Sequence, residues 1–221
     1  QHLQDLYTEG ARTLVRARPV SATQNGIAPD LAGGYYADRL NDYSPAAEQA
    51  SRDALRKLSR RMADSPLDVT DERINRDIVA NVARFFAGHE DFPIGFIDTW
   101  MGLSPFVVTQ INGPLMDIPR SLESSHQVHS ERDAEDYLNR LAAFDEMVAS
   151  VRAKLEADAE RGWIAPAVIL RGALDFIGRF TAAEPARHAL VTRFADKLAN
   201  SDAFNAEARE QLVHRAAEQM G

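Results

Sequence analysis

The stretch that decides the fold is residues 130–161, which read SERDAEDYLNRLAAFDEMVASVRAKLEADAER. Ser130 is a favourable helix start, and the acidic residues that follow it suit the unpaired amides of a first helical turn. Apolar residues recur at three- and four-residue steps from Ala134 to Leu155, which gives a helix one apolar face. At 1.5 Å per residue the helix would reach roughly 48 Å, the length of a whole domain. We therefore expect one long central helix, around which the rest of the chain packs.

Helical periodicity extends over most of the remaining chain. It predicts helices over residues 3–17, 45–63, 70–87, 166–180, 185–200 and 205–219. In the helix over 70–87, the side predicted to be buried consists of Ile74, Ile78, Val79, Val82, Phe85 and Phe86. In the helix over 45–63, five basic residues are spaced to form one face, which we interpret as solvated, with an anion-binding patch as the alternative. These five residues are Arg52, Arg56, Lys57, Arg60 and Arg61.

Two segments lack this periodicity. Residues 19–43 read as a long loop that ends in a tyrosine cluster, interpreted as packing rather than as a ligand cage. In residues 88–125, Gly and Pro recur too closely for a regular helix of normal length, and only residues 106–111 (FVVTQI) have a β-like composition. We expect an extended, buried connector there. The predicted fold class is all-α: an irregular multi-helix array with one long central helix and an extended connector, forming a single helical domain over residues 1–221.

Composition excludes several classes of function. The 221 residues include 25 Lys and Arg against 33 Asp and Glu, a formal net charge of −8, and no cysteine. Without thiols there are no disulfides, thiolate zinc sites or cysteine nucleophiles. The negative charge argues against nucleic-acid binding, and no apolar run approaches the roughly 20 residues of a membrane span. The chain as given shows no signal peptide, which leaves a cytoplasmic or an exported, periplasmic location open.

No short motif predicts an active site. The segment that begins at His89 starts like an HExxH zinc helix but has no second histidine at the required position. His126 and His129 lie three residues apart in a serine-containing segment, which favours a polar loop over a metal site. A nucleophile elbow and a phosphate-binding glycine loop are also missing from the sequence.

Five segments, taken in order, resemble a known bacterial family. They are residues 38–45 (DRLNDYSP), 72–77 (ERINRD), 110–114 (QINGP, followed by Ile118-Pro119), 133–141 (DAEDYLNRL) and 161–166 (RGWIAP). Over roughly residues 30–180 the chain is similar to the first half of the family of domain of unknown function 885. Asp145 and Ala165 stand where that family usually has proline, and both departures affect local geometry at helix ends.

The resemblance implies a longer, helical metallopeptidase-like protein of the gluzincin type, with a His-Glu zinc motif in its second half. This chain would then be an N-terminal portion whose partner is the C-terminal half of the same protein. Zinc would be bound in that half, and a peptide is the possible substrate.

In such peptidases the N-terminal helices form one wall of a deep cleft. That makes Gln110 and Asn112 of the connector the candidates for facing substrate, because amide side chains can hydrogen-bond a peptide backbone. The other interpretation is that both satisfy backbone groups of the connector itself. No catalytic or metal-ligating residue is assigned in this chain.

Other classes of function stay open. In one alternative the chain is a stand-alone helical protein-interaction module without catalysis, which binds a partner through the apolar face of its last helix near Leu212 and Val213. In another it is a small cofactor-free enzyme that uses His126 or His129.

Overall fold

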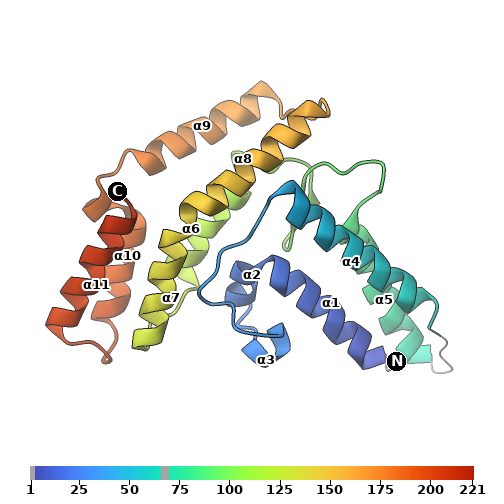
Figure 1. Cartoon of the computed structure of the whole chain (residues 1–221), viewed down its shortest axis with the longest axis horizontal. Coiled ribbons are helices and arrows are strands. Elements are labelled where there is room, and N and C mark those ends of the chain that lie inside the picture. The colour runs from blue at the N-terminus through green and yellow to red at the C-terminus, as the bar shows by residue number, and fades with distance from the viewer. Residues whose placement is uncertain (1–2, 66–69) are drawn as a thin grey trace.

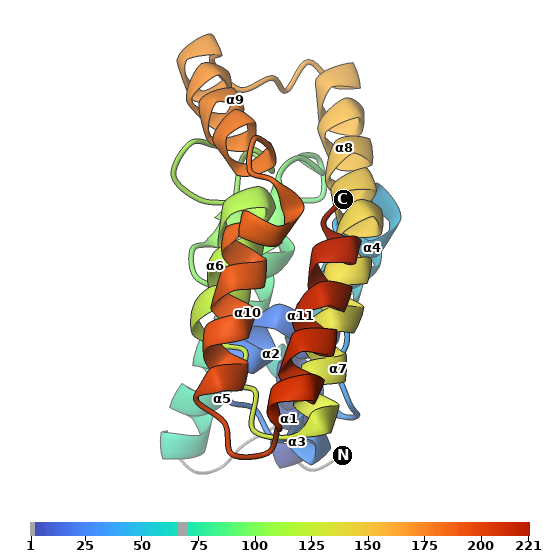
Figure 2. The same cartoon turned by 90° about the vertical axis from the view of Figure 1, so that its left-hand side faces the viewer.

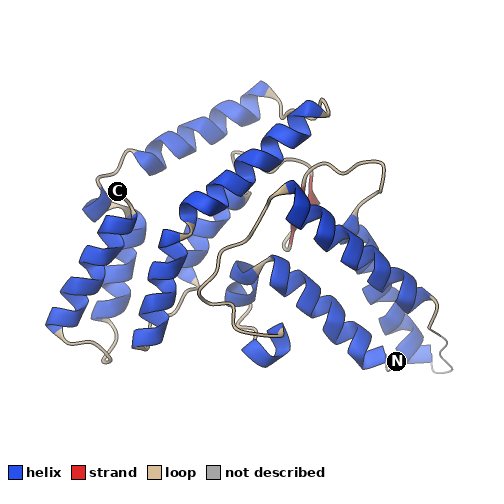
Figure 3. Cartoon of the chain, in the orientation of Figure 1, coloured by secondary structure: helices blue, strands red, loops and turns tan. Residues whose placement is uncertain are grey.

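The computed structural model describes residues 3–65 and 70–221. Helices dominate, and the β-structure of the described residues is one small hairpin (Figure 3), so the predicted all-α fold class is confirmed. The elements are α1 (Leu3–Ala17), α2 (Pro19–Gln24), α3 (Pro29–Ala32), α4 (Pro45–Ala63), α5 (Thr70–Ala87), β1 (Phe96–Asp98), β2 (Gly102–Ser104), α6 (Pro114–Ser124), α7 (Glu131–Ala142), α8 (Phe144–Glu160), α9 (Ala167–Thr181), the short 3-10 helix η1 (Pro185–Arg187), α10 (Ala189–Ala199) and α11 (Ala206–Gln219).

The helices form two groups (Figure 1). In the N-terminal group, α4 lies against both α1 and α5; in the C-terminal group, α10 lies against α6 and α11, and α11 against α7. Helix α8 continues from α7 and contacts α4, and α9 then leads back towards the C-terminal group. Figure 2 shows α5 and α9 on one side of the molecule and α4 and α8 on the other. Among the described helices, none is long and apolar enough to cross a membrane.

The helix expected over residues 130–161 is present as α7 followed directly by α8. Ala143 alone separates them, with φ −84° and ψ 1°, outside the usual helical values. The apolar face of α7 packs in one cluster with Phe194 of α10, whereas Met147 of α8 packs in another with Tyr43. The two halves of the apolar stripe therefore face different cores, although Val148 of α8 stays 43% exposed.

The core of the C-terminal group is apolar and aromatic. The Tyr137 ring stacks on Phe194 with centroids 4.5 Å apart, and the Tyr137 hydroxyl donates to the carbonyl oxygen of Leu190 at 2.8 Å. Leu212 is buried in the same cluster, and Val213 packs against it. The expectation of an open apolar face near Leu212 and Val213 is therefore wrong, because α11 packs along α7 and α10.

The outward side of α5 departs from the sequence prediction. Its packing against α1 and α4 uses small side chains such as Ala83 and Ala87. Of the six apolar residues predicted to be buried, Val79 and Phe86 pack against the same cluster. The other four are exposed instead, by between 43% and 60%: Ile74, Ile78, Val82 and Phe85. The prediction is wrong for these four because the helix turns the opposite side to its neighbours.

The connector is more regular than expected. It contains α6, which starts with Pro114 and includes Pro119, so the expectation that no regular helix fits there is wrong. A proline inside a helix removes one backbone hydrogen bond, and here the buried Ile118 and Leu122 stabilise the helix around it. The strands lie at β1 and β2 rather than at residues 106–111, which are irregular.

Candidate functional site

The β1–β2 hairpin is held by charged side chains from the neighbouring helices. The backbone amide of Ile97 in β1 donates to Glu48 Oε2 at 3.0 Å, and Arg18 Nε donates to the Ile97 carbonyl oxygen at 3.0 Å. Arg18 and Glu48 also form a buried ion pair, and the Arg18 guanidinium lies 4.4 Å from the centre of the Tyr43 ring. The pair satisfies both backbone polar groups of Ile97 and so fixes β1 against α4.

A second set of charged residues fixes the chain just before β1. Arg52 Nη2 donates to the carbonyl oxygens of Ile94 at 2.7 Å and Gly95 at 3.2 Å. Asp158 Oδ2 of α8 accepts from the Gly95 amide at 3.1 Å, and Asp158 pairs with Lys154. Burial lowers the pKa of both Arg52 and Lys154, and the neighbouring carboxylates oppose that shift. The hairpin therefore has a rigid, charge-lined support.

Sequence analysis missed these supporting residues. Arg52 was placed on a solvated face, yet it is only 1% exposed, so that prediction is wrong for this residue. The overlooked signal is its spacing: Glu48, Arg52 and Leu55 recur at three- and four-residue steps and form one buried side of α4. Lys57 and Arg60 of the same helix are exposed, as predicted.

The hairpin turn is tied to the connector through Asp98. Its Oδ1 accepts from the amides of Trp100 at 2.8 Å and Met101 at 3.2 Å, and its Oδ2 accepts from Asn112 Nδ2 at 3.4 Å. Thr109 Oγ1 lies 2.6 Å from Asn112 Oδ1 and accepts from the Asn112 amide at 3.1 Å. The Asn112 side chain thus bonds two other side chains, those of Asp98 and Thr109, rather than the backbone groups of the connector.

Gln110 has a different environment. It is exposed, and its side chain packs against Gly172 of α9, where an added Cβ would lie 2.6 Å from Gln110 Oε1. Within the described part of the chain the Gln110 amide has no hydrogen-bond partner. Its donors and its acceptor are therefore available to a ligand.

A hollow of about 250 Å³ brings the two candidate residues together. It lies between the hairpin, the connector and α9, and Gln110, Thr109 and Asn112 supply its polar groups. The rest of the lining is mostly apolar, from Met101, Leu103, Pro105, Ile111 and Ile169. An apolar depression bordered by a few polar groups suits an apolar residue of a peptide: its side chain fills the depression, and its backbone hydrogen-bonds the polar groups at the rim.

A larger hollow of about 420 Å³ lies where the loop before α4 crosses α8. Its charged lining includes the carboxylates of Asp38, Asp42 and Glu146 together with Arg39. This hollow does not contain either candidate residue, and no further feature of the described chain points to a ligand there.

The two histidines are not brought together. His126 is buried, and its Nε2 donates to the carbonyl oxygen of Asp133 at 3.0 Å, while its Nδ1 accepts from Arg140 at 3.0 Å. Burial, together with the nearby Arg140 charge, lowers the pKa of His126 to about 4. His129 is exposed. The polar-loop prediction is therefore right for His129 and wrong for His126. Among the described residues, no group of three or more His, Cys, Asp or Glu side chains could hold a metal ion.

Residues 19–43, which were predicted to be a long loop, contain the short helices α2 and α3, and Arg140 fixes this segment to the C-terminal group. It is fully buried and, besides His126, donates to Arg39 O at 3.1 Å, Thr23 Oγ1 at 2.7 Å and Tyr36 O at 3.4 Å. Burial lowers the pKa of Arg140 to about 10, so the side chain stays charged at neutral pH. Of the three tyrosines predicted to pack together, Tyr36 and Tyr43 are buried, but in two different clusters, and Tyr35 is only partly buried.

The comparisons place these features in a family. The model of the family described as "Bacterial protein of unknown function (DUF885)" matches residues 19–221. A crystal structure described as "putative lipoprotein from Colwellia psychrerythraea" is similar, with a TM-score of 0.95 and 35% sequence identity. The match covers 97% of this chain but only 37% of that chain. No curated protein matches. The chain belongs to the DUF885 family of bacterial proteins.

Proposed function

We propose that this chain is the N-terminal helical portion of a longer zinc peptidase-like hydrolase, in which it forms the scaffold and one wall of the substrate cleft. The observation that carries the proposal is the hollow beside α9, where Gln110 and Asn112 border an apolar lining. A peptide would place an apolar side chain in the hollow and bond its backbone to the Gln110 amide.

The length of the similar solved chain supports this proposal. This chain spans 37% of it, which leaves room for a separate catalytic half. In the proposal, zinc and the catalytic groups belong to that C-terminal half, and the residues of this chain bind and orient the peptide. The charged support beneath the hairpin keeps the wall rigid, which limits the entropy lost on binding.

The gene that encodes the chain gives the first test. We expect several hundred further residues after Gly221, including a His-Glu zinc motif. A stop codon directly after Gly221 would contradict the proposal and favour a stand-alone protein.

Hydrolysis of a mixed peptide library gives the second test. The longer protein should cleave peptides, and a zinc chelator should abolish the cleavage. Residues 1–221 alone, supplied with zinc, should show no turnover; turnover that a chelator abolishes would place catalysis in this chain and overturn the proposal.

The role of Gln110 can be tested in the same assay. In the longer protein, Gln110→Ala should raise KM about fivefold with little change in kcat, the loss of one hydrogen bond made equally to substrate and transition state. Gln211→Ala, an exposed glutamine on α11, is the matched control and should leave both constants unchanged. Equal KM and kcat values for the two variants would show that Gln110 does not contact the substrate.

A further inference from the structure

Helix α5 carries apolar residues on two opposite sides. One side packs on α1 and α4 through residues such as Ala83. The other side, here called the outer α5 stripe, has apolar residues at three- and four-residue steps over three turns, which places them in one row. The row consists of Ile74, Ile78, Val82 and Phe85.

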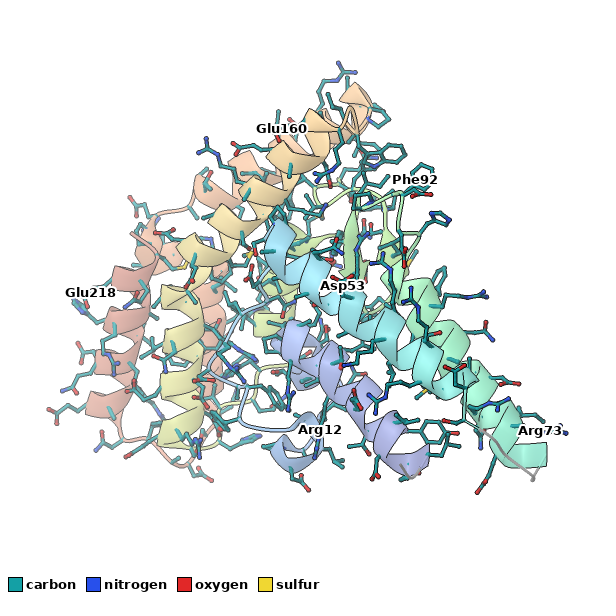
Figure 4. The ribbon with its side chains drawn as sticks, turned by 45° about the vertical axis from the view of Figure 1, so that its right-hand side comes forward. Arg12, Asp53, Arg73, Phe92, Glu160 and Glu218 are labelled. Atoms are coloured by element: carbon teal, nitrogen blue, oxygen red, sulfur yellow. The ribbon has the colours of Figure 1, made fainter. Side chains whose placement is uncertain are left out.

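The outer α5 stripe is uncovered in this chain. A helix that is apolar on two opposite sides is normally buried on both, and contiguous exposed apolar surface marks an interaction site. The neighbouring helix α4 shows the usual alternative, because its outward side carries charged residues such as Asp53 (Figure 4). The exposed apolar row therefore distinguishes α5 from α4.

The stripe continues onto the hairpin. The Phe85 ring lies over Gly102, where an added Cβ would come within 2.0 Å of the ring, and Gly102 has φ +92°. Only glycine combines that backbone conformation with so close an approach. Met101, the residue before Gly102, is exposed and lines the hollow beside α9. The Phe85 side chain therefore packs on the backbone of the hairpin with one side of its ring, although most of the side chain is exposed.

Helix α9, on the same side of the molecule as α5, differs from it (Figure 2). Ala173 is the one residue of this helix that is buried, whereas Val168 and Leu174 are more than 60% exposed. These two residues are six positions apart, and the exposed charged residues Arg171 and Asp175 lie between them on the outward side of the helix. The apolar row of α5 therefore has no counterpart on α9.

We propose that the outer α5 stripe is the docking surface for the polypeptide that follows this region in the longer protein. The occupant would be helical and would present an apolar row of its own, since regularly spaced helix ridges pack into the grooves of another helix. The inference rests on the proposed function for the existence of a longer chain. Its support is that most of the similar solved chain, of which this region is 37%, lies outside the region.

The absence of cysteine in these 221 residues allows a direct test in the longer protein. Val82 lies in the outer α5 stripe, and Val148 lies on α8, on the other side of the molecule; both are valines in helices and both are 43% exposed in this chain. Val82→Cys and Val148→Cys are made separately, and the rate of thiol labelling by a maleimide is measured, with the unsubstituted protein as the blank. Labelling in urea gives the unprotected rate for each.

We expect the thiol at position 82 to react at least about tenfold more slowly than the thiol at position 148, because docking buries it. Equal labelling at 82 and 148 would overturn the inference. Protection that disappears on dilution would also overturn it, by assigning the surface to a second copy of the protein.

The labelling rate reports whether position 82 is buried and does not depend on peptide hydrolysis. A longer protein that is protected at position 82 but cleaves no peptide would overturn the proposed function and leave the docking surface standing. A protein that cleaves peptides but labels equally at both positions would overturn the docking surface and leave the proposed function standing.

Discussion

Helices α7 and α5 have similar amphipathic patterns, but their large apolar residues lie in different surroundings. In α7, Tyr137 and Leu141 are buried among residues of α10 and α11. In α5, Ile78 and Phe85 face outwards, and small residues make the contact with the neighbouring helices. The C-terminal group thus covers its apolar surface with its own helices, while the N-terminal group leaves one row for a partner. Periodicity shows that a helix has an apolar face, but only tertiary contacts show what covers it.

The largest expected effect lies in the closed core of the C-terminal group. Phe194→Ala removes the ring that stacks on Tyr137 and should lower the free energy of unfolding by about 4 kcal/mol, from lost burial and the cavity left behind. Urea denaturation of residues 1–221 measures it. Phe92→Ala is the control, because Phe92 is 62% exposed on the loop after α5 (Figure 4), and it should cost less than about 0.5 kcal/mol. If both variants lost the same free energy of unfolding, buried and exposed aromatic residues would contribute equally to stability, against our expectation.

The N-terminal group depends more on buried charge. Glu48→Ala leaves Arg18 and Arg52 buried without their carboxylate, which should cost about 3 kcal/mol in the same urea experiment. Asp53→Ala removes the exposed partner of Arg56 on the same helix and should change stability by less than about 0.5 kcal/mol. If Glu48→Ala were as mild as this control, the charged support of the hairpin would not contribute to stability.

The pH dependence of the stability tests the buried environment of His126, which packs against Tyr137 of the C-terminal group. Because the pKa of His126 is about 4 in the folded protein and about 6.5 when unfolded, the unfolded state binds more protons between these values. The stability contribution of neutral His126 is complete above about pH 6.5 and is lost as pH falls towards 4, by about 2–3 kcal/mol. His126→Gln should lack this part of the pH dependence, as measured by urea unfolding at several pH values.

His129→Gln is the matched control, in the same segment but exposed. It should retain the pH dependence of the unsubstituted protein. A His126→Gln curve parallel to that of the control would contradict the buried environment assigned to His126.

The smallest predicted effect is the same in both groups. Ser44 caps α4 by accepting from the Ala47 amide at 3.3 Å, and Ser130 caps α7 by accepting from the Asp133 amide at 3.2 Å. Each serine-to-alanine change should cost about 1 kcal/mol, because it leaves a helix-end amide unpaired. Ser124→Ala, outside any helix start, is the control. A large difference between the losses of the two capping variants would show that the stabilisation by a helix cap depends on the tertiary packing around it.

The helices could be predicted from the sequence because their signals are local. Capping serines, prolines at first helical positions and apolar spacing located α1, α4, α5 and α11, and the start of α7, to within a residue or two. The exposed side of α5 could not be predicted, because both of its sides are apolar and the pattern does not say which one meets α4. The break at Ala143 was missed for a similar reason: one continuous stripe serves two cores.

The candidate site was predicted only through the resemblance. It selected Gln110 and Asn112, and the structure brings both to one hollow, but their exposure to substrate stays a prediction. Arg18, Glu48 and Asp158, which support the hairpin, act on backbone groups far away in sequence, and no local pattern marks such contacts. Buried Arg52 was the exception, since its spacing with Leu55 was visible in the sequence.

The contacts of Arg140 limit how this sequence can diverge. One guanidinium serves acceptors in four directions: His126, Thr23, Tyr36 and Arg39. A lysine in its place would have a single nitrogen and could not reach them all. Position 126 can change only to a side chain that still offers an acceptor towards Arg140, such as an amide. Across an alignment of relatives, we expect positions 126 and 140 to covary, with a change at one accompanied by a compensating change at the other.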